Sequence, residues 1–282
     1  ANLVTLLAQR LTGAQARVVI NEQNLPSAEF ALFGGAQVKG WFLRRLYPHA
    51  DRVTVISKGI ARELTSLYSI PGHKVQVIPN PVDVARIRAM GAVQLKHPWF
   101  RLGMPVLVAA GRLHPQKGFT YLIRAFAIVR DAMPCKLVIL GEGPQRHTLE
   151  QLVTKLSLSD DITLLGFQDN PYNYMRSSTA FILSSLYEGF GNVLVEALAL
   201  GVPVISTRCP VGPEEIIAHE KTGLLVPPAN ENALAQAILR LLKDAGLRRR
   251  LSAHGLERAM DFDVKRIVSQ YEELFEYLAS GV

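Results

Sequence analysis

The stretch Leu183–Ser206, "LSSLYEGFGNVLVEALALGVPVIS", decides the fold that this chain is expected to adopt. It runs from an apolar segment through a glycine-containing loop into a segment with helical periodicity that starts near Gly191-Asn192, and then into a second apolar segment. Strand, loop, helix and strand in this order are typical of a parallel sheet that is covered on both faces. Two carboxylates, Glu188 and Glu196, flank the loop, and ligands of such sheets bind beyond the carboxyl ends of the strands.

The same alternation extends over the chain from Pro105 onward. Amphipathic segments separate six apolar segments that predict strands: "PVLVAA", "KLVIL", "ITLLGF", "AFILSS", "PVIST" and "TGLLVP". Six such strands with helices between them predict an α/β fold with a doubly wound parallel sheet, that is, a Rossmann-like domain.

The first part of the chain predicts a smaller unit of the same kind. The segments "RVVI", "DRVTVIS" and "KVQVIP" predict three strands, too few for a complete six-stranded domain. We therefore expect residues 1–80 to be part of a Rossmann-like domain whose front end is missing. Asn80-Pro81 breaks regular structure and marks the connection to a second domain over residues 81–262. We expect residues 263–282 to form a helix that packs back toward the N-terminal part.

Composition restricts the possible partners. The chain has 282 residues and a formal net charge of +7, which favours an anionic partner. It has no zinc-finger spacing, RNP signature or arginine-rich arm, so a nucleic acid is not expected. No apolar run reaches the ~20 residues of a membrane-spanning helix. Cys135 and Cys209 have no metal-ligand spacing, which suits reduced thiols in the cytoplasm.

The loop after "PVLVAA" reads "GRLHPQKG" and carries two cations, Arg112 and Lys117. A planar guanidinium and a compact ammonium between glycines at the end of a strand suit a diphosphate. The order Gly-Lys-Ser/Thr of a P-loop is absent, and a purely structural role for either residue is the alternative.

Two further loops leave alternatives open. In "GEGP", Gly141 permits the close approach either of a ligand or of a neighbouring loop. After "ITLLG", Phe167 can lie against a nucleobase or belong to the core.

A single ligand can account for both the two carboxylates and the two cations. Carboxylates repel a phosphate but accept hydrogen bonds from hydroxyl groups, whereas cations and a helix N-terminus hold an anion. The combination of Glu188 and Glu196 with Arg112 and Lys117 favours a nucleotide sugar, which has a charged middle and hydroxyl-rich ends. Taken singly, each acid can also be an ordinary helix or loop surface residue.

These segments resemble a known family. "EGFGNVLVE" looks like the Glu-x7-Glu motif of retaining glycosyltransferases of the GT4 type, which have the GT-B fold. "NPVD", "GRLHPQKG", "LGEGP", "LLGFQDN", "EALALGVPVIST" and "KTGLLVPP" are similar to other landmarks of that family, in order. "CPVGPEEII" resembles enzymes of lipid-linked oligosaccharide or surface polysaccharide synthesis, which often use UDP-sugars.

The resemblance implies a role for each matching residue. Arg112 and Lys117 would grip the donor diphosphate and stabilise the leaving group, Glu188 would contact the donor sugar, and Glu196 would bind the ribose. The region of Phe167 would border the base. The backbone of the segment between the two acids would meet sugar and phosphate, namely at Phe190, Gly191, Asn192 and Val193. Residues 1–80 would belong to the acceptor side.

The implied reaction moves a sugar from a nucleoside-diphosphate sugar to a glycan or lipid-linked acceptor with retention of the anomeric configuration. The family needs no metal, and this sequence has no Asp-x-Asp cation site. Two departures matter. The loop expected at Asn21–Asn24, "NEQN", lacks the His that members often carry there, and the glycine loop of the family's first strand is absent.

Other functions remain open at this point. A nucleotide-sugar-binding module without turnover also fits the residues, and a nucleotide-sugar epimerase of the same overall fold fits them less well. Trp41, Phe42 and Leu43 precede Arg44 and Arg45, which suits peripheral contact with an anionic membrane. The alternative is a helix that packs this segment against its own sheet.

Overall fold

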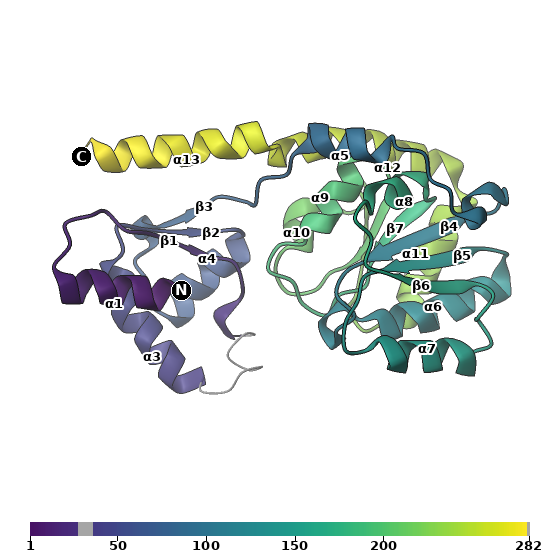
Figure 1. Ribbon diagram of the computed structural model, residues 1–282, viewed down its shortest axis with the longest axis horizontal. Helices are drawn as coiled ribbons and strands as arrows, with labels where there is room; N and C mark the ends of the chain where they lie inside the picture. Colours follow the sequence, from purple (N-terminus) through teal and green to yellow (C-terminus); the bar gives the residue numbers. More distant parts are fainter. Residues whose placement is uncertain (28–35, 281–282) are drawn as a thin grey trace. The chain divides into compact units, whose positions relative to one another are not determined.

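The computed structural model describes residues 1–27 and 36–280 of the chain. It forms two compact units (Figure 1). Unit 1 contains Ala1–Pro81, Glu188–Phe190 and Val264–Val282, and unit 2 contains Val82–Tyr187 and Gly191–Asp263. The polypeptide therefore leaves unit 1 after Pro81, contributes Glu188–Phe190 to it, and returns to it with its last helix.

Unit 2 contains a six-stranded parallel sheet in the order β6-β5-β4-β7-β8-β9. Each of the six predicted strands is present. The strands are β4 (Val106–Ala110), β5 (Lys136–Leu140), β6 (Ile162–Gly166), β7 (Ala180–Leu183), β8 (Val204–Thr207) and β9 (Leu224–Val226). The strand order reverses between β4 and β7, so the loops after these two strands border the topological switch point, where ligands of such sheets bind.

Helices cover both faces of this sheet (Figure 1). The helices of unit 2 are α5 (Val84–Gly91), α6 (Phe119–Ala132), α7 (Arg146–Lys155), α8 (Tyr172–Ser177), α9 (Asn192–Ala199), α10 (Pro213–Ile216), α11 (Glu231–Lys243) and α12 (Ala245–Ala259). Leu107 and Ala109 of β4 belong to the core that α6 and α11 complete, and the alternate residue Val108 is fully buried on the other face. Burial on both faces explains why these strands read as unbroken apolar runs.

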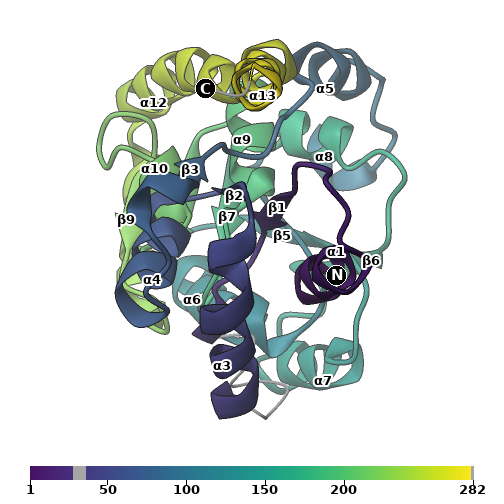
Figure 2. The ribbon, with the colours of Figure 1, turned by 90° about the vertical axis from the view of Figure 1, so that its left-hand side faces the viewer.

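Unit 1 contains a three-stranded parallel sheet in the order β1-β2-β3. Its elements are α1 (Asn2–Thr12), β1 (Val19–Glu22), α3 (Ala36–Leu46), β2 (Arg52–Val55), α4 (Lys58–Leu67), β3 (Val75–Val77) and α13 (Val264–Ala279). Figure 2 shows α13 on one side of the strands and α1, α3 and α4 on the other.

Strand β1 lies two residues later than the sequence predicts. The predicted strand was "RVVI", residues 17–20, but Asn21 and Glu22 belong to β1 and pair with Thr54 and Val55 of β2. Asn21 Nδ2 donates to Thr54 Oγ1 at 2.9 Å, so polar side chains are satisfied inside the sheet. The predicted loop Asn21–Asn24 therefore starts at Gln23, and that part of the prediction is wrong.

Helix α13 packs on the sheet of unit 1 through one apolar stripe. Ile267 and Leu274 are buried with Ile78, while Tyr271 and Leu278 pack beside them. Their spacing of three and four residues is that of an amphipathic helix. None of the helices among residues 1–27 and 36–280 has the length and apolar composition to cross a membrane.

Candidate functional site

The loop after β4, residues 111–118, is fastened to the loop after β5. Gly111 N donates to Leu140 O at 2.9 Å, and Leu113 N donates to Glu142 O at 2.8 Å. Gly141 has φ +128°, and a Cβ there would lie 2.0 Å from Gly111 O, so only glycine fits. A neighbouring loop is thus what approaches Gly141, which confirms that interpretation of "GEGP". A ligand contact at Gly141 stays a prediction.

The loop after β4 is also fastened to the loop after β7. Leu186 N donates to Gln116 O at 2.7 Å, and Gln116 Nε2 donates to Tyr187 O at 3.0 Å. Ser184 Oγ donates to Lys117 O at 2.8 Å. Gln116 and Ser184 were not predicted, because hydrogen bonds to distant backbone carbonyls leave no signature in the local sequence.

Arg112 and Lys117 both lie on this fastened loop. The Arg112 residue is exposed, and Lys117 is half-buried. A Cβ on Gly111 would lie 3.3 Å from Lys117 Cε, so the aliphatic stem of the lysine runs along that glycine. Two cations are thereby held on one loop at the carboxyl end of a central strand, a position suited to an anionic ligand.

Helix α9 begins at Asn192, where the sequence predicts it. Gly191 precedes it with φ +99°, a conformation that favours glycine. Among the described residues, no side chain caps the N-terminus of α9. Backbone N–H groups of a helix start without such a cap attract anions. Asn192 is exposed and Val193 half-buried, so this helix start can meet a ligand.

Glu196 lies one turn into α9 and is half-buried. Burial raises the pKa of its carboxyl to about 7, because removal from water disfavours the charged form. Burial also raises the pKa of the Tyr172 hydroxyl, Glu196 raises it further, and Arg86 lowers it. These three side chains, from α9, α8 and α5, form an electrostatic cluster.

Tyr172 lies just beyond the stretch "LLGFQDN" and was not predicted as a site residue. Asn170 shapes the start of α8: its Oδ1 accepts from Tyr172 N at 3.2 Å, and its Nδ2 donates to Met90 O at 2.9 Å. An Asn-Pro pair that starts a helix after a strand was the available signal.

Phe167 follows β6, the outermost strand on its side of the sheet. Its side chain is 74% exposed, so the interpretation as a core residue is wrong. Contact with a nucleobase is compatible with this exposure and stays a prediction.

Glu188 and Phe190 are placed differently from the other predicted residues. Both are buried and belong to unit 1 with Gly189, where a Cβ would lie 2.3 Å from Gln23 O. The structure thus brings together, at one edge of the sheet of unit 2, Arg112, Lys117, Gly141, Gly191, Asn192, Val193 and Glu196. The two acids of the Glu-x7-Glu motif belong to different units, which the sequence did not predict.

Comparisons with known proteins identify the family. The family described as "Glycosyl transferases group 1" matches residues 97–258. The family described as "Glycosyltransferase Family 4" matches residues 2–86. The chain belongs to the group 1 glycosyl transferases. Together the two matches cover the fastened loops of unit 2 and the strands of unit 1.

Relatives of this glycosyltransferase are found among archaea and bacteria. An uncharacterized glycosyltransferase of Methanocaldococcus jannaschii is 32% identical over 262 residues, which cover 82% of this chain and 64% of the relative. A Campylobacter jejuni enzyme is 35% identical over 269 residues, covering 94% of this chain and 71% of the relative. Its name is N-acetylgalactosamine-N,N'-diacetylbacillosaminyl-diphospho-undecaprenol 4-alpha-N-acetylgalactosaminyltransferase. The chain thus spans about two thirds of the length of these relatives.

A solved structure has the same fold. HepE of Anabaena in complex with UDP-glucose superposes with a TM-score of 0.84 at 23% identity, over 98% of this chain and 76% of HepE. This likeness shows the fold alone, and that fold is of the GT-B type, as the sequence predicts.

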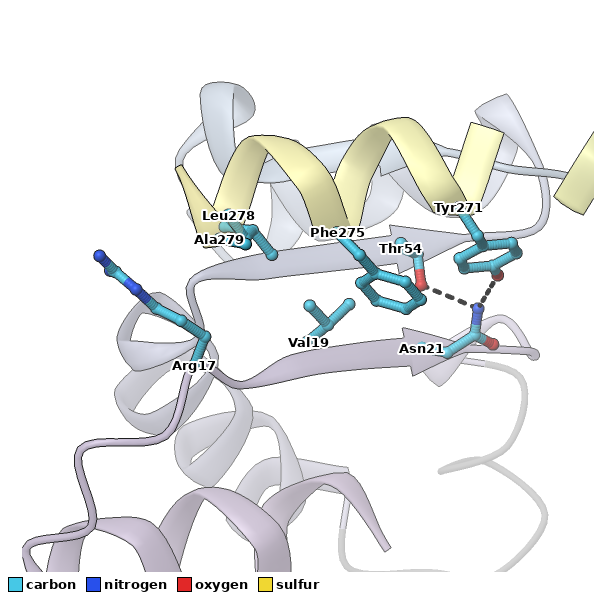
Figure 3. A pocket seen from close by; sticks show the side chains of 8 residues that line it. All are labelled: Arg17, Val19, Asn21, Thr54, Tyr271, Phe275, Leu278 and Ala279. Carbon is cyan, nitrogen blue, oxygen red and sulfur yellow. Dashed lines mark hydrogen bonds between the residues drawn. The ribbon is translucent and has the colours of Figure 1, made fainter. Parts of the chain in front are cut away.

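In this glycosyltransferase, Asn21 stands in the segment that lacks the expected His. Asn21 lines an open pocket of about 540 Å³ on unit 1, between β1, β2 and α13 (Figure 3). Its Nδ2 donates to Tyr271 OH at 3.1 Å, and Gln23 Nε2 donates to its Oδ1. Asn21 is held by neighbouring side chains on both polar atoms.

Among the described residues, no cluster of three or more His, Cys, Asp or Glu side chains could hold a metal ion. Arg112 and Lys117 are the positively charged side chains that the sequence predicts for the loop after β4.

Proposed function

We propose that this chain is the donor-binding part of a retaining glycosyltransferase, with part of its acceptor side. The enzyme would move a sugar from a nucleoside-diphosphate sugar, most favourably a UDP-sugar, to a glycan or lipid-linked acceptor. One observation carries the proposal: hydrogen bonds fasten the loop of Arg112 and Lys117 to the segment that leads into α9.

The donor diphosphate would lie between the cationic loop and the start of α9. Arg112 offers two parallel donors and Lys117 a point charge, and the helix start adds backbone N–H groups. As the glycosidic bond breaks, negative charge accumulates on the departing diphosphate. Groups already held in place stabilise this charge without reorganisation, which is often the largest catalytic contribution.

The uncharged parts of the donor would meet the two acids. Glu196 would accept hydrogen bonds from ribose hydroxyls, and Glu188 would contact the sugar. β6 is three strands away from β7, roughly 14 Å at about 4.8 Å per step, so Phe167 would border the base at the far end of one extended ligand.

The names of similar proteins support the choice of substrates. The Campylobacter relative acts on a diphospho-undecaprenol-linked glycan, and HepE was solved with UDP-glucose. For this chain, UDP-sugars are therefore the first donors to test and lipid-linked glycans the first acceptors. Independence of metal is part of the proposal, because side-chain cations would balance the diphosphate.

Ligand binding and turnover separate the proposal from its alternative. UDP, GDP and ADP are titrated against thermal unfolding of the chain. A ligand at about a hundred times its Kd should add roughly 2.7 kcal/mol to the free energy of unfolding. Lys117→Ala should weaken the response, whereas Lys155→Ala, which removes an exposed lysine of α7, should preserve it.

Turnover is measured as release of nucleoside diphosphate over a panel of donors and lipid-linked acceptors, with and without EDTA. Release that EDTA leaves unchanged supports a metal-independent transferase. Binding of UDP without release over the whole panel would instead support a nucleotide-sugar-binding module. Absence of any nucleotide binding would refute both.

A further inference from the structure

Glu142 lies in the loop after β5, which two neighbouring elements hold in place. Its backbone carbonyl accepts a hydrogen bond from Leu113 N, in the loop after β4, at 2.8 Å. One residue before Glu142, Gly141 N donates at 2.8 Å to the carbonyl of Gly166, the last residue of β6. The loop that carries Glu142 is therefore fixed between the loop after β4 and the end of β6.

The Glu142 side chain lies against the end of β6. A Cβ on Gly166 would come within 2.8 Å of Glu142 Oε1, so the carboxylate occupies space that a side chain at this position would need. Gly166 has φ +79°, a conformation that favours glycine. The next residue along the chain is Phe167, whose side chain is 74% exposed. A carboxylate and an exposed aromatic residue are thus both adjacent to one glycine.

Arg146 of α7 holds this carboxylate in position. Its Nη1 donates to Glu142 Oε1 at 2.6 Å, its Nη2 donates to Leu164 O of β6 at 2.9 Å, and its Nε lies 2.9 Å from Glu150 Oε1. The guanidinium is thereby attached to β6 as well as to two carboxylates. A carboxylate can accept about four hydrogen bonds. Because the Glu142 side chain is 52% exposed, it retains the capacity to accept from a ligand.

The ordinary alternative is that the two acids serve only as ion-pair partners of Arg146. Glu142 and Glu150 each lie four residues from Arg146, and exposed pairs of this kind contribute little to stability. The two acids differ in their surroundings. Glu150 lies within α7, whereas Glu142 precedes that helix and lies at the carboxyl ends of β5 and β6. Ligands of parallel sheets bind beyond these strand ends.

We infer that Glu142 recognises the base of the donor by accepting a hydrogen bond from the ring N–H of uracil. The inference rests on the proposed function, in which the donor extends from the loop after β4 to a base beside Phe167. A base that stacks on an aromatic ring keeps its edge available for hydrogen bonds. Uracil presents a single ring N–H there, on N3, and a carboxylate accepts it. Arg146 is a positioning residue that holds the carboxylate beside β6.

Calorimetric titration of the full chain with UDP and with its N3-methyl analogue tests the inference. The analogue keeps the diphosphate, the ribose and both carbonyl groups of the base, but it lacks the ring N–H. Wild type should bind UDP about tenfold more tightly than the analogue, which is the size expected for one hydrogen bond to a charged group. Glu142→Ala should bind UDP about tenfold more weakly than wild type and should no longer distinguish the two ligands.

Glu150→Ala is the matched control. It removes an equal charge beside Arg146, while the bond between Arg146 and Glu142 stays in place. This variant should bind UDP like wild type and keep the preference for UDP over the analogue.

The outcomes separate the inference from the proposed function on which it rests. Equal affinity of wild type for the two ligands would overturn the inference and leave nucleotide binding standing. A Glu142→Ala variant that still distinguishes the two ligands would have the same consequence. Equal loss of UDP affinity in Glu150→Ala would also overturn the inference, because the effect would then be one of net charge. Absence of nucleotide binding by wild type would refute the inference and the proposed function together.

Discussion

The six-stranded sheet of unit 2 and the three-stranded sheet of unit 1 use the same parallel pairing but differ in their surroundings. In unit 2, hydrogen bonds and close contacts at glycines join the loops after β4, β5 and β7. Buried apolar side chains fill the space between the sheet and its helices. In unit 1, an open pocket of about 540 Å³ lies between β1 and α13, and Phe275, which lines it, is 53% exposed. The loops of unit 2 are therefore joined to one another, whereas β1 and α13 of unit 1 border an open pocket. Substitutions matched between the two units can test this difference.

The largest contrast should appear when one cation is removed from each unit. Lys117→Ala should lower kcat of the proposed transfer roughly a hundredfold to a thousandfold, because the departing diphosphate loses a fixed positive charge. Arg17→Ala removes a cation of unit 1 that is 60% exposed and paired with Asp51, and it should leave kcat nearly unchanged. Steady-state assays of both variants decide this. Equal effects would remove the catalytic role from the loop of unit 2.

Two glycines with nearly the same backbone conformation test how tightly the loops are packed. Gly118 has φ +61° and Gly13 has φ +66°. A Cβ on Gly118 would lie 2.2 Å from Ser184 O, whereas a Cβ on Gly13 would meet nothing within 4 Å. Gly13→Ala should cost about 1 kcal/mol in free energy of unfolding from backbone strain alone. Gly118→Ala should cost roughly 3 kcal/mol, because a backbone clash is added.

Chemical denaturation of the two glycine variants gives the difference. If Gly118→Ala were as stable as Gly13→Ala, the loop after β4 could shift to accommodate a Cβ at little cost in free energy. That result would contradict the packing described for unit 2.

The pH dependence of stability tests the carboxyl buried in unit 2. The pKa of Glu196 is raised from 4.5 to about 7 in the folded chain. The carboxyl therefore favours folding fully below pH 4.5, and this contribution is lost as the pH rises through 7. Relative to Glu196→Gln, wild type should lose up to about 3 kcal/mol across this window. Parallel stability curves for the two proteins between pH 4.5 and 7 would show that Glu196 titrates normally.

The smallest effect is expected from adding one methylene group to each sheet. Val19→Ile extends a side chain into the open pocket of unit 1 and should raise the unfolding free energy by at most about 0.8 kcal/mol. Val108→Ile adds the same group to a fully buried position of β4 and should cost roughly 1–3 kcal/mol through overpacking. Thermal denaturation of both variants reports the sign, and a loss of stability in Val19→Ile would contradict the open space at β1.

Local sequence patterns predicted the strands of unit 2 closely because burial on both faces leaves an unbroken apolar signal. They placed β1 two residues early, since Asn21 and Glu22 look like a loop but pair with β2. They located Arg112, Lys117 and Glu196 on the correct loop and helix. They missed Gln116 and Tyr172, whose importance comes from partners that tertiary structure alone brings near. They also missed that Glu188 belongs to unit 1, because assignment to a unit depends on contacts such as that of Gly189 with Gln23.

The return of the chain to unit 1 with α13 imposes an order on biosynthesis. Unit 2 ends at Asp263, so every residue of its sheet has been synthesised before α13 begins at Val264. Domains generally fold as units while the ribosome is still adding residues. During synthesis, the strands of unit 1 therefore lack α13, which will cover one face of their sheet. That face stays uncovered until all of unit 2 has emerged. A stop codon placed just before Val264 should yield a chain in which unit 2 matures and the three strands of unit 1 never receive their cover.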